Sequence, residues 1–178
     1  MDLDKYKFTN AENLILNYLF KYPTTQFMGI ELARATNLSQ TAIKKTLILL
    51  KSKELINLEK KVILSVKLNR DNKNIFYLKK LDNLKQIYES SLTNELSNKC
   101  LGSTIILFGS FSRGEDTEES DIDIAIIESN KKTINLEKYQ KNFNRKIDLH
   151  FYKEFKIIPK NLKESIINGI ILKGAIKL

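Results

Sequence analysis

The segment "ILFGSFSRGEDTEESDIDIAII", from Ile106 to Ile127, restricts the fold of this chain more than any other stretch of its sequence. Branched and aromatic residues at both ends predict two β-strands, and the glycines, serines and acids between them predict a turn and a loop. Six carboxylates occupy the nine positions from Glu115 to Asp123, in a chain whose net charge is +9. The segment therefore predicts a strand, a tight turn and an acidic loop that leads into a second strand.

Strands and helices alternate through the C-terminal part of the chain. Short β-branched runs predict the strands, and apolar residues at helical spacing predict the helices between them. This alternation predicts an α/β layer with a small mixed sheet. The predicted strands cover residues 103–108, 122–127 and 146–152, and the predicted helices cover 111–116, 135–143 and 161–168.

The N-terminal part has a different order, with helices first and strands afterwards. Ser39 is a good N-cap for the third predicted helix. The predicted helices cover residues 11–20, 30–35 and 40–53, and the predicted strands cover 55–58, 62–68 and 75–78, with "NRDNKN" as a hairpin tip. Three helices followed by a β-hairpin is the order of a winged helix-turn-helix domain.

Apolar residues recur every three or four positions from Leu81 to Leu96, which predicts a helix with a narrow apolar stripe. The stripe suits either packing between the two parts of the chain or pairing with a second copy in a homodimer. The sequence thus predicts an α+β protein in three parts. These are a winged helix-turn-helix domain over residues 1–80, a linker helix over 81–98 and a C-terminal α/β domain over 99–178.

The composition excludes several kinds of site. Cys100 is the only cysteine, which excludes an internal disulfide and a thiolate zinc site. His150 is the only histidine, so a histidine metal site or a Ser-His-Asp triad has little support. No apolar run is long enough to span a membrane, and the first residues lack the apolar core of a secretory signal. We therefore expect a cytoplasmic protein with no membrane partner.

The positive charge is concentrated in the N-terminal part. Residues 1–100 carry 17 Lys and Arg against 10 Asp and Glu, whereas residues 101–178 carry 13 against 11. A basic surface suits a polyanion such as double-stranded DNA. A lysine-rich composition of the kind that an AT-rich genome produces would give the same excess, so the charge alone leaves both interpretations open.

The residues around the acidic loop are suited to holding a phosphate and a metal ion. Gly109 permits a tight turn, and Ser110 offers a hydroxyl and an N–H that attract anions. Asp121 and Asp123 are two positions apart on a strand, so their carboxylates project from one face, where a cation relieves their repulsion. Asp148 completes a two-metal site if its strand pairs beside theirs, and carboxylate oxygens suit Mg²⁺.

The order of these residues resembles the nucleotidyltransferase superfamily that includes DNA polymerase β, and within it the minimal nucleotidyltransferases. The pattern is Gly109-Ser110, then Arg113-Gly114, a polar loop and "SDID" from Ser120 to Asp123, and the resemblance extends to the closing "IINGIILKG". It implies a polymerase β-like nucleotidyltransferase domain over residues 99–178.

The resemblance also implies a role for each matching residue. Gly109 and Ser110 match positions that hold the triphosphate, and Asp121 and Asp123 match two metal-binding carboxylates. Asp148 matches the third carboxylate, a metal ligand and candidate general base. Arg113 matches an arginine that either contacts phosphate or braces the loop, and these alternatives stay open. We expect Glu115, Asp116, Glu118 and Glu119 to form a solvated loop. His150 could share the strand face of Asp148, and we expect a packing or surface role for it, with catalysis or a nucleotide contact as the alternative.

The resemblance implies a metal-dependent enzyme. With Mg²⁺ or Mn²⁺, it would move a nucleoside monophosphate from a nucleoside triphosphate onto a hydroxyl of a partner macromolecule, and we expect the transferred group to be AMP from ATP. Proteins of this kind include antitoxins that modify a helical RNase toxin, which would make such a toxin the protein acceptor. The alternative is a DNA-binding transcriptional regulator whose transferase fold is inactive and serves as a nucleotide sensor or docking surface.

The stretch "GIELARATNLSQTAIKKTLILLKSKELI" resembles the short helix, turn and recognition helix of winged helix-turn-helix domains. That resemblance implies DNA contacts from the exposed start of the third helix and from the wing. A role in docking a protein partner is the alternative. The predicted DNA-binding residues are Gln40, Thr41, Lys44 and Lys45 on the helix, with Lys60, Lys61, Arg70 and Lys73 on the wing.

Overall fold

The computed structural model describes residues 6–60 and 64–176 of the chain. The contacts divide the chain into two compact units, Met1–Lys79 and Lys80–Leu178, and each is described by itself. Among the described residues, no helix combines the length and the apolar character that crossing a membrane requires.

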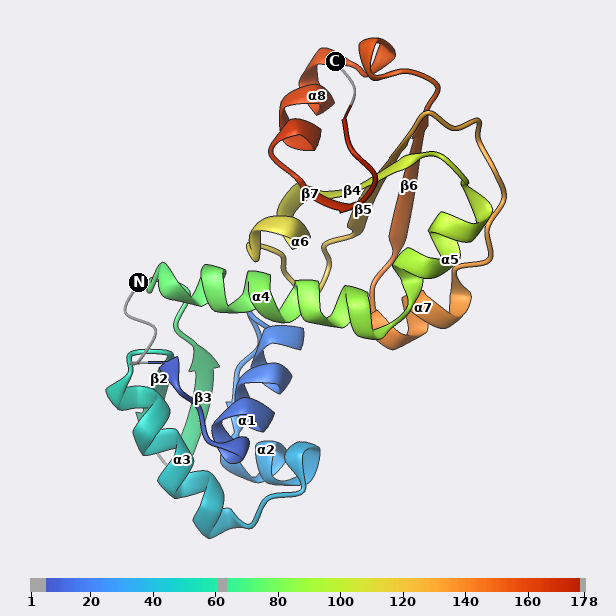
Figure 1. The fold of residues 1–178 in the computed structure, drawn as a ribbon. Helices are drawn as coiled ribbons and strands as arrows, with labels where there is room; N and C mark the ends of the chain where they lie inside the picture. Colours follow the sequence, from blue (N-terminus) through green and yellow to red (C-terminus); the bar gives the residue numbers. More distant parts are fainter. Residues whose placement is uncertain (1–5, 61–63, 177–178) are drawn as a thin grey trace. The chain divides into compact units, whose positions relative to one another are not determined.

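The first unit consists of helices packed on a small antiparallel sheet (Figure 1). Strand β3 lies in the middle of the sheet, and β1 and β2 pair on either side of it. The buried side chains of the helices and of β2 and β3 form one apolar cluster. The elements are α1 (Asn10–Lys21), β1 (Phe27–Met28), α2 (Gly29–Thr36), α3 (Gln40–Ser52), β2 (Ile56–Lys60) and β3 (Leu64–Leu68).

Local hydrogen bonds fix where the helices of the first unit begin. The Thr9 hydroxyl accepts from the backbone N–H of Glu12, and the Glu12 carboxylate accepts from the backbone N–H of Thr9, so the two form a capping box. The Ser39 hydroxyl accepts from the backbone N–H of Ala42 at 3.2 Å, as expected for an N-cap. The three predicted helices are confirmed to within two residues at each end.

The strand predicted for residues 75–78 is wrong, because this segment begins helix α4 (Asn74–Glu89). Ile75 and Leu78 are buried three positions apart in the first apolar cluster, a spacing that a helix satisfies and a strand does not. The "NRDNKN" segment is consequently no hairpin tip, and it connects β3 to α4. The Asn72 side chain accepts from the Asn74 N–H at the start of that helix. The hairpin strands are β2 and β3, while Lys61, Val62 and Ile63 lie outside the described residues.

The single helix predicted from Leu81 to Leu96 is also wrong. The structure has two helices, α4 and α5 (Leu92–Lys99), separated at Ser90 and Ser91. Ser91 has a φ of 62°, in the left-handed region that ends a right-handed helix. The Ser90 hydroxyl donates to the carbonyl of Ile87 and accepts from the N–H of Leu92, so it serves the end of one helix and the start of the next.

The second unit contains a four-stranded mixed sheet with the strand order β6-β5-β4-β7. Strands β5 and β6 are parallel, and β4 runs antiparallel to both β5 and β7. The small mixed sheet is therefore confirmed, and the sequence prediction missed only its edge strand β7. The elements are β4 (Thr104–Phe108), α6 (Gly109–Arg113), β5 (Ile122–Ile127), α7 (Glu137–Phe143), β6 (Ile147–Tyr152), η2 (Phe155–Ile157), α8 (Lys160–Ile167) and β7 (Ile170–Lys173).

Both faces of this sheet are covered. Helices α5 and α7 lie on one face of the sheet and α8 on the other (Figure 1). Side chains from α5 and α7 pack in a large apolar cluster, and those of α8 pack in a smaller one. The alternation of β5 explains the division, because Ile124 and Ile126 belong to the first cluster and Ala125 and Ile127 to the second. Asp123, near the start of β5, projects its carboxylate on the same face of the sheet that α8 covers.

Candidate functional site

Three aspartates lie at one end of the sheet, on the face that α8 covers farther along the strands. Asp123 is two residues before Ala125, which packs in the cluster beneath α8, so its side chain shares that face. Asp121 directly precedes β5. The carboxylates are partly accessible, with exposed side-chain fractions of 41% for Asp121, 30% for Asp123 and 36% for Asp148. The end of the sheet thus presents acids where the apolar layer stops.

Strand pairing places Asp148 next to Asp123. In the parallel ladder between β5 and β6, the Cα partner of Asp123 is Asp148, and that of Ala125 is His150. Paired residues on neighbouring strands project to the same face of a sheet. The two carboxylates and the imidazole therefore emerge on one side, beside Asp121.

Lys146 places a positive charge beside this group of acids. Its ammonium lies 2.7 Å from Oδ1 of Asp148 and 3.9 Å from Oδ2 of Asp121. The hydrogen bond to Asp148, followed by the attraction of the same carboxylate, raises the pKa of Lys146 above its ordinary value. Lys146 thus remains charged at neutral pH and relieves repulsion between the aspartates.

His150 makes the second contact with the acidic group. Its Nε2 lies 3.3 Å from Oδ1 of Asp123, and its ring meets the ring of Phe108 edge-on with centroids 5.2 Å apart. The sequence placed His150 on the same strand face as Asp148 and favoured a packing or surface role, with catalysis or a nucleotide contact as the alternative; Lys146 was not considered. The signal for Lys146 was available, because it lies two positions before Asp148 in the strand predicted for residues 146–152.

Gly109 makes room for the carboxylate of Asp123. Its φ is +75°, in the left-handed region that favours glycine, and a Cβ at this position would lie 2.4 Å from Oδ2 of Asp123. The backbone conformation therefore favours glycine, and a Cβ here would displace the carboxylate of Asp123. The turn predicted from the sequence at Gly109 is thus shaped around one of the three predicted metal ligands.

The short helix α6 carries the other residues of the glycine-serine segment. Ser110 is partly buried near its start, and the backbone carbonyl of Ser110 accepts from the N–H of Glu115. Ser112 is buried, and its hydroxyl donates to the carbonyl of Gly109 at 2.8 Å. Arg113 is exposed and pairs through Nε with Glu115 at 2.7 Å. An exposed pair of this kind contributes little to stability, so it restrains Arg113 only weakly.

The oxygen donors at this end of the sheet suit a hard divalent cation. Within residues 6–60 and 64–176, however, no three His, Cys, Asp or Glu side chains lie close enough together to hold a metal ion. Lys146 and His150 instead occupy the positions beside the carboxylates. Shared ligation by Asp121, Asp123 and Asp148 therefore requires these side chains to turn and Lys146 to give way.

Asp116 is completely buried, so its prediction as a solvated loop residue is wrong. Its Oδ1 accepts from the Asn83 amide at 2.8 Å, and its Oδ2 pairs with Nη2 of Arg145 at 3.1 Å. A buried carboxylate needs such partners, because desolvation penalises an isolated charge heavily. This contact could not be predicted from the sequence, because Asn83 and Arg145 lie in segments distant from the acidic loop.

The four predicted DNA-binding residues lie at the start of α3. Gln40, Thr41, Lys44 and Lys45 are all exposed, as a surface that contacts a polyanion requires. The next turn of the helix also exposes Ile48, at 66%. Two of the predicted wing residues, Arg70 and Lys73, lie between β3 and α4 and outside the hairpin strands.

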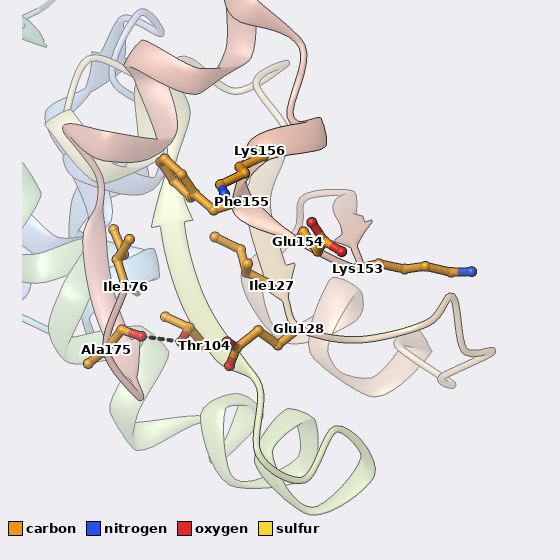
Figure 2. A pocket seen from close by; sticks show the side chains of 9 residues that line it. All are labelled: Thr104, Ile127, Glu128, Lys153, Glu154, Phe155, Lys156, Ala175 and Ile176. Atoms are coloured by element: carbon orange, nitrogen blue, oxygen red, sulfur yellow. Dashed lines mark hydrogen bonds between the residues drawn. The ribbon is translucent and has the colours of Figure 1, made fainter. Parts of the chain in front are cut away.

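A separate cavity of about 200 Å³ lies near the other ends of the strands (Figure 2). Thr104 and Ile127, at the opposite ends of β4 and β5 from the aspartates, both line it. The Thr104 hydroxyl donates to the carbonyl of Ala175 at 2.7 Å. The lining mixes apolar, acidic and basic side chains and includes none of the predicted site residues.

Comparison with known families places the acidic end of the sheet within a recognised domain. Residues 89–173 match the family model described as a nucleotidyltransferase domain. Searches of curated proteins and of solved structures found no match. The matched residues contain Gly109, Ser110 and the three aspartates. The match therefore supports the prediction that this part of the second unit is a nucleotidyltransferase domain.

Proposed function

We propose that the second unit catalyses metal-dependent transfer of a nucleoside monophosphate from a nucleoside triphosphate to a hydroxyl of a partner macromolecule. The pairing of Asp123 with Asp148 is the observation that carries this proposal. Together with Asp121 on the same face, it brings three carboxylates to the start of the acidic strand. The family match supports nucleotidyl transfer as the general chemistry.

The proposed reaction forms a bond between the acceptor oxygen and the α-phosphorus. The bond from that phosphorus to the oxygen that bridges the α- and β-phosphates breaks, and pyrophosphate leaves. Asp148 accepts the proton of the acceptor hydroxyl, because its carboxylate is partly exposed and can be reached from solvent. Lys146 contacts this carboxylate directly, so Lys146 has to move away before the acceptor hydroxyl can reach Asp148.

Asp121, Asp123 and Asp148 are the residues that would hold Mg²⁺ or Mn²⁺. A bound divalent ion would stabilise the negative charge that develops on the phosphates during the displacement. Gly109 contributes by leaving space for the Asp123 carboxylate. The three carboxylates are partly exposed and lie close together, so their mutual repulsion favours the binding of a cation.

Gly109, Ser110 and Arg113 are proposed to bind the triphosphate, with ATP as the nucleotide and AMP as the transferred group. The resemblance to minimal nucleotidyltransferases supports this assignment. Arg113 is exposed beside Glu115, so its guanidinium can exchange a weak local pair for a phosphate contact. The same resemblance supports a protein acceptor, such as a tyrosine of a helical RNase toxin, and hence an antitoxin role.

The test of transfer uses Asp121→Ala combined with Asp123→Ala. We expect the double variant to lose transfer of labelled AMP by more than about 100-fold, because it removes two of the three carboxylates. Transfer is measured from α-labelled ATP to proteins co-purified with the chain, in the presence of Mg²⁺ or Mn²⁺. Glu119→Gln is the matched control, since Glu119 is an exposed acid of the same loop. Equal labelling by the double variant and the control would exclude this site.

An inactive nucleotidyltransferase fold used as a nucleotide sensor or docking surface is the second candidate function. The pairing of Asp148 with Lys146, and the lack of a ready group of three metal-holding side chains in the described residues, favour it. Calorimetry separates the candidates: the active enzyme binds ATP more tightly with Mg²⁺, whereas metal-independent binding of ATP supports the sensor.

The first unit is proposed to bind double-stranded DNA as a winged helix-turn-helix domain. Its three helices and antiparallel hairpin support this proposal, as does the exposure of Lys44 and Lys45 at the start of α3. Each phosphate contact adds about 0.9 to the salt dependence of binding, so Lys44→Ala with Lys45→Ala should lower the slope by about 2. Lys138→Ala with Lys141→Ala, on α7, is the control. An unchanged slope in a fluorescence titration would favour the protein-docking alternative.

A further inference from the structure

The buried carboxylate of Asp116 connects three segments of the second unit. It accepts from Asn83 on α4 and pairs with Arg145, which lies between α7 and β6. Both partners are themselves buried, with exposed fractions of 2% for Asn83 and 8% for Arg145. The same Asn83 amide also donates to the carbonyl of Phe111 in α6 at 2.9 Å. Asp116 is therefore held by contacts that do not depend on its neighbours in sequence.

Stability alone does not explain why Asp116 and Arg145 are buried as an ion pair. Removing two charges from water costs several kcal/mol per ion, and well-packed apolar residues often stabilise as much or more. Arg113 and Glu115 form an exposed ion pair in the same segment, so an ion pair can form here without being buried. In the buried pair both oxygens of Asp116 are held, Oδ2 by Arg145 at 3.1 Å and Oδ1 by Asn83 at 2.8 Å, so the direction of the carboxylate is defined.

Asp116 stands at one end of the loop that leads to Asp121. Between them, the N–H of Thr117 donates to the Ser120 hydroxyl at 2.9 Å, and the N–H of Ser120 donates back to the Thr117 carbonyl at 3.2 Å. At the other end, the N–H of Ile122 donates to the carbonyl of Lys146 at 2.8 Å. The loop is thus a short closed turn tied down at both ends.

Asp121 depends on this loop more than the other two aspartates do. Asp123 and Asp148 are held by the ladder between β5 and β6, whereas Asp121 directly precedes β5 and has no partner in that ladder. The position of its carboxylate therefore depends on the chain before it as well as on the Ile122 hydrogen bond after it. Asp116 is the first buried residue on that side of Asp121.

We propose that Asp116 is a positioning residue that fixes Asp121 for the nucleotidyl transfer proposed above, on which this role rests. Arg145 and Asn83 hold Asp116, and Asp116 holds the start of the loop. Asp116 itself touches neither nucleotide nor metal. Removal of the Asp116 carboxylate would leave the carboxylates of Asp123 and Asp148 in place and would allow that of Asp121 to move.

The test uses Asp116→Asn in the full chain, because asparagine keeps the size of the side chain and removes its charge. We expect amide hydrogen exchange in residues 117–122 to become at least about tenfold faster, with exchange in β4 unchanged. We also expect Mn²⁺ binding, followed by electron paramagnetic resonance in the presence of ATP, to weaken by about tenfold.

Glu12→Gln is the matched control, since Glu12 is an equally buried carboxylate paired with a lysine in the first unit. It should lower the melting temperature and leave both exchange in residues 117–122 and Mn²⁺ binding within twofold of the wild type. Wild-type exchange in residues 117–122 of Asp116→Asn would overturn the proposal. If that variant does not fold, Asn83→Ala, which leaves the pair with Arg145, should show the same pattern at smaller amplitude, and wild-type exchange in it would again overturn the proposal. A wild-type chain that binds no Mn²⁺ with ATP would refute the metal-dependent function, and exchange would still decide whether Asp116 holds the loop.

Discussion

Glu12 in the first unit and Asp116 in the second are both buried carboxylates paired with a cation, yet their surroundings differ. Glu12 completes the capping box of α1 and pairs with Lys53 at 2.6 Å, and neither residue is a predicted site residue. Asp116 pairs with Arg145 and leads along the chain to Asp121. Similar buried pairs thus accompany helix stability in one unit and an acidic site in the other. The comparison shows that the role of a buried charged residue depends on which other residues its segment contains.

The prediction with the largest expected effect concerns the acidic site of the second unit and would sharpen that side of the comparison. Gly109→Ala adds a Cβ next to Oδ2 of Asp123 on a backbone with positive φ. We expect a loss of about 3 kcal/mol in the free energy of unfolding and displacement of Asp123, because strain and overpacking combine. Chemical denaturation measures the first effect and Mn²⁺ titration the second.

Gly102→Ala provides the matched control for that substitution. Gly102 also has a positive φ, +79°, but a Cβ there would meet no atom within 4 Å. It should therefore cost only about 1 kcal/mol and leave Mn²⁺ binding unchanged. Equal losses from the two variants would show that the approach of Asp123 to Gly109 has no energetic consequence.

The next prediction tests the first half of the comparison. Burial raises the pKa of Glu12, but hydrogen bonds from Lys53 and Thr9 outweigh it and hold the pKa below its ordinary value. The stabilisation is therefore present above the ordinary pKa of 4.5 and is lost as the pH falls through the lower folded-state value. Glu12→Gln should lose about 2 kcal/mol at pH 7.

Denaturant unfolding of the wild type and of Glu12→Gln between pH 7 and pH 3 measures this difference. The variant should lose less stability on acidification than the wild type, so the two curves should converge at low pH. Glu59→Gln, on strand β2, is a control in which the replaced acid is exposed. Parallel curves for wild type and Glu12→Gln would break the comparison, because Glu12 would then have no charge-dependent role in the fold.

The smallest expected effect concerns the cation beside the acidic site. Lys146→Met removes the ammonium that contacts Asp148 and approaches Asp121. Mn²⁺ affinity should rise by about threefold, a modest change because the exposed pair is largely screened by water. Lys141→Met, an exposed lysine on α7, is the control. Weaker Mn²⁺ binding by Lys146→Met would mean that Lys146 supports the metal site and does not compete with the metal.

Much of the fold followed from local patterns in the sequence. The Ser39 cap and the apolar spacing after it predicted helix α3, and the alternation after Asp121 predicted strand β5 with its correct bounds. The strand prediction for residues 146–152 also allowed Asp148 to be placed beside Asp123, as the ladder has it. These features depend on hydrogen bonds and side-chain periods within a few residues, which a sequence displays directly.

Two of the failures, the strand predicted for residues 75–78 and the missed strand β7, share a physical origin. Ile75 to Leu78 has the composition of a strand, but Ile75 and Leu78 are buried on one side of a helix. Tertiary packing overrode local propensity there. Strand β7 was missed because its pairing with β4 depends on residues far away in the chain.

The sequence by itself determined the glycine turn and the acidic strand, since each is written in the order and period of neighbouring residues, whereas the pairing of Asp148 beside Asp123 needed the sheet. Only the tertiary structure decided that Asp116 is buried against Arg145 and that Lys146 and His150 flank the aspartates. Contacts of this kind join segments whose separation along the chain carries no periodic signal. Burial then determines which acids remain accessible for chemistry and which hold the chain in place.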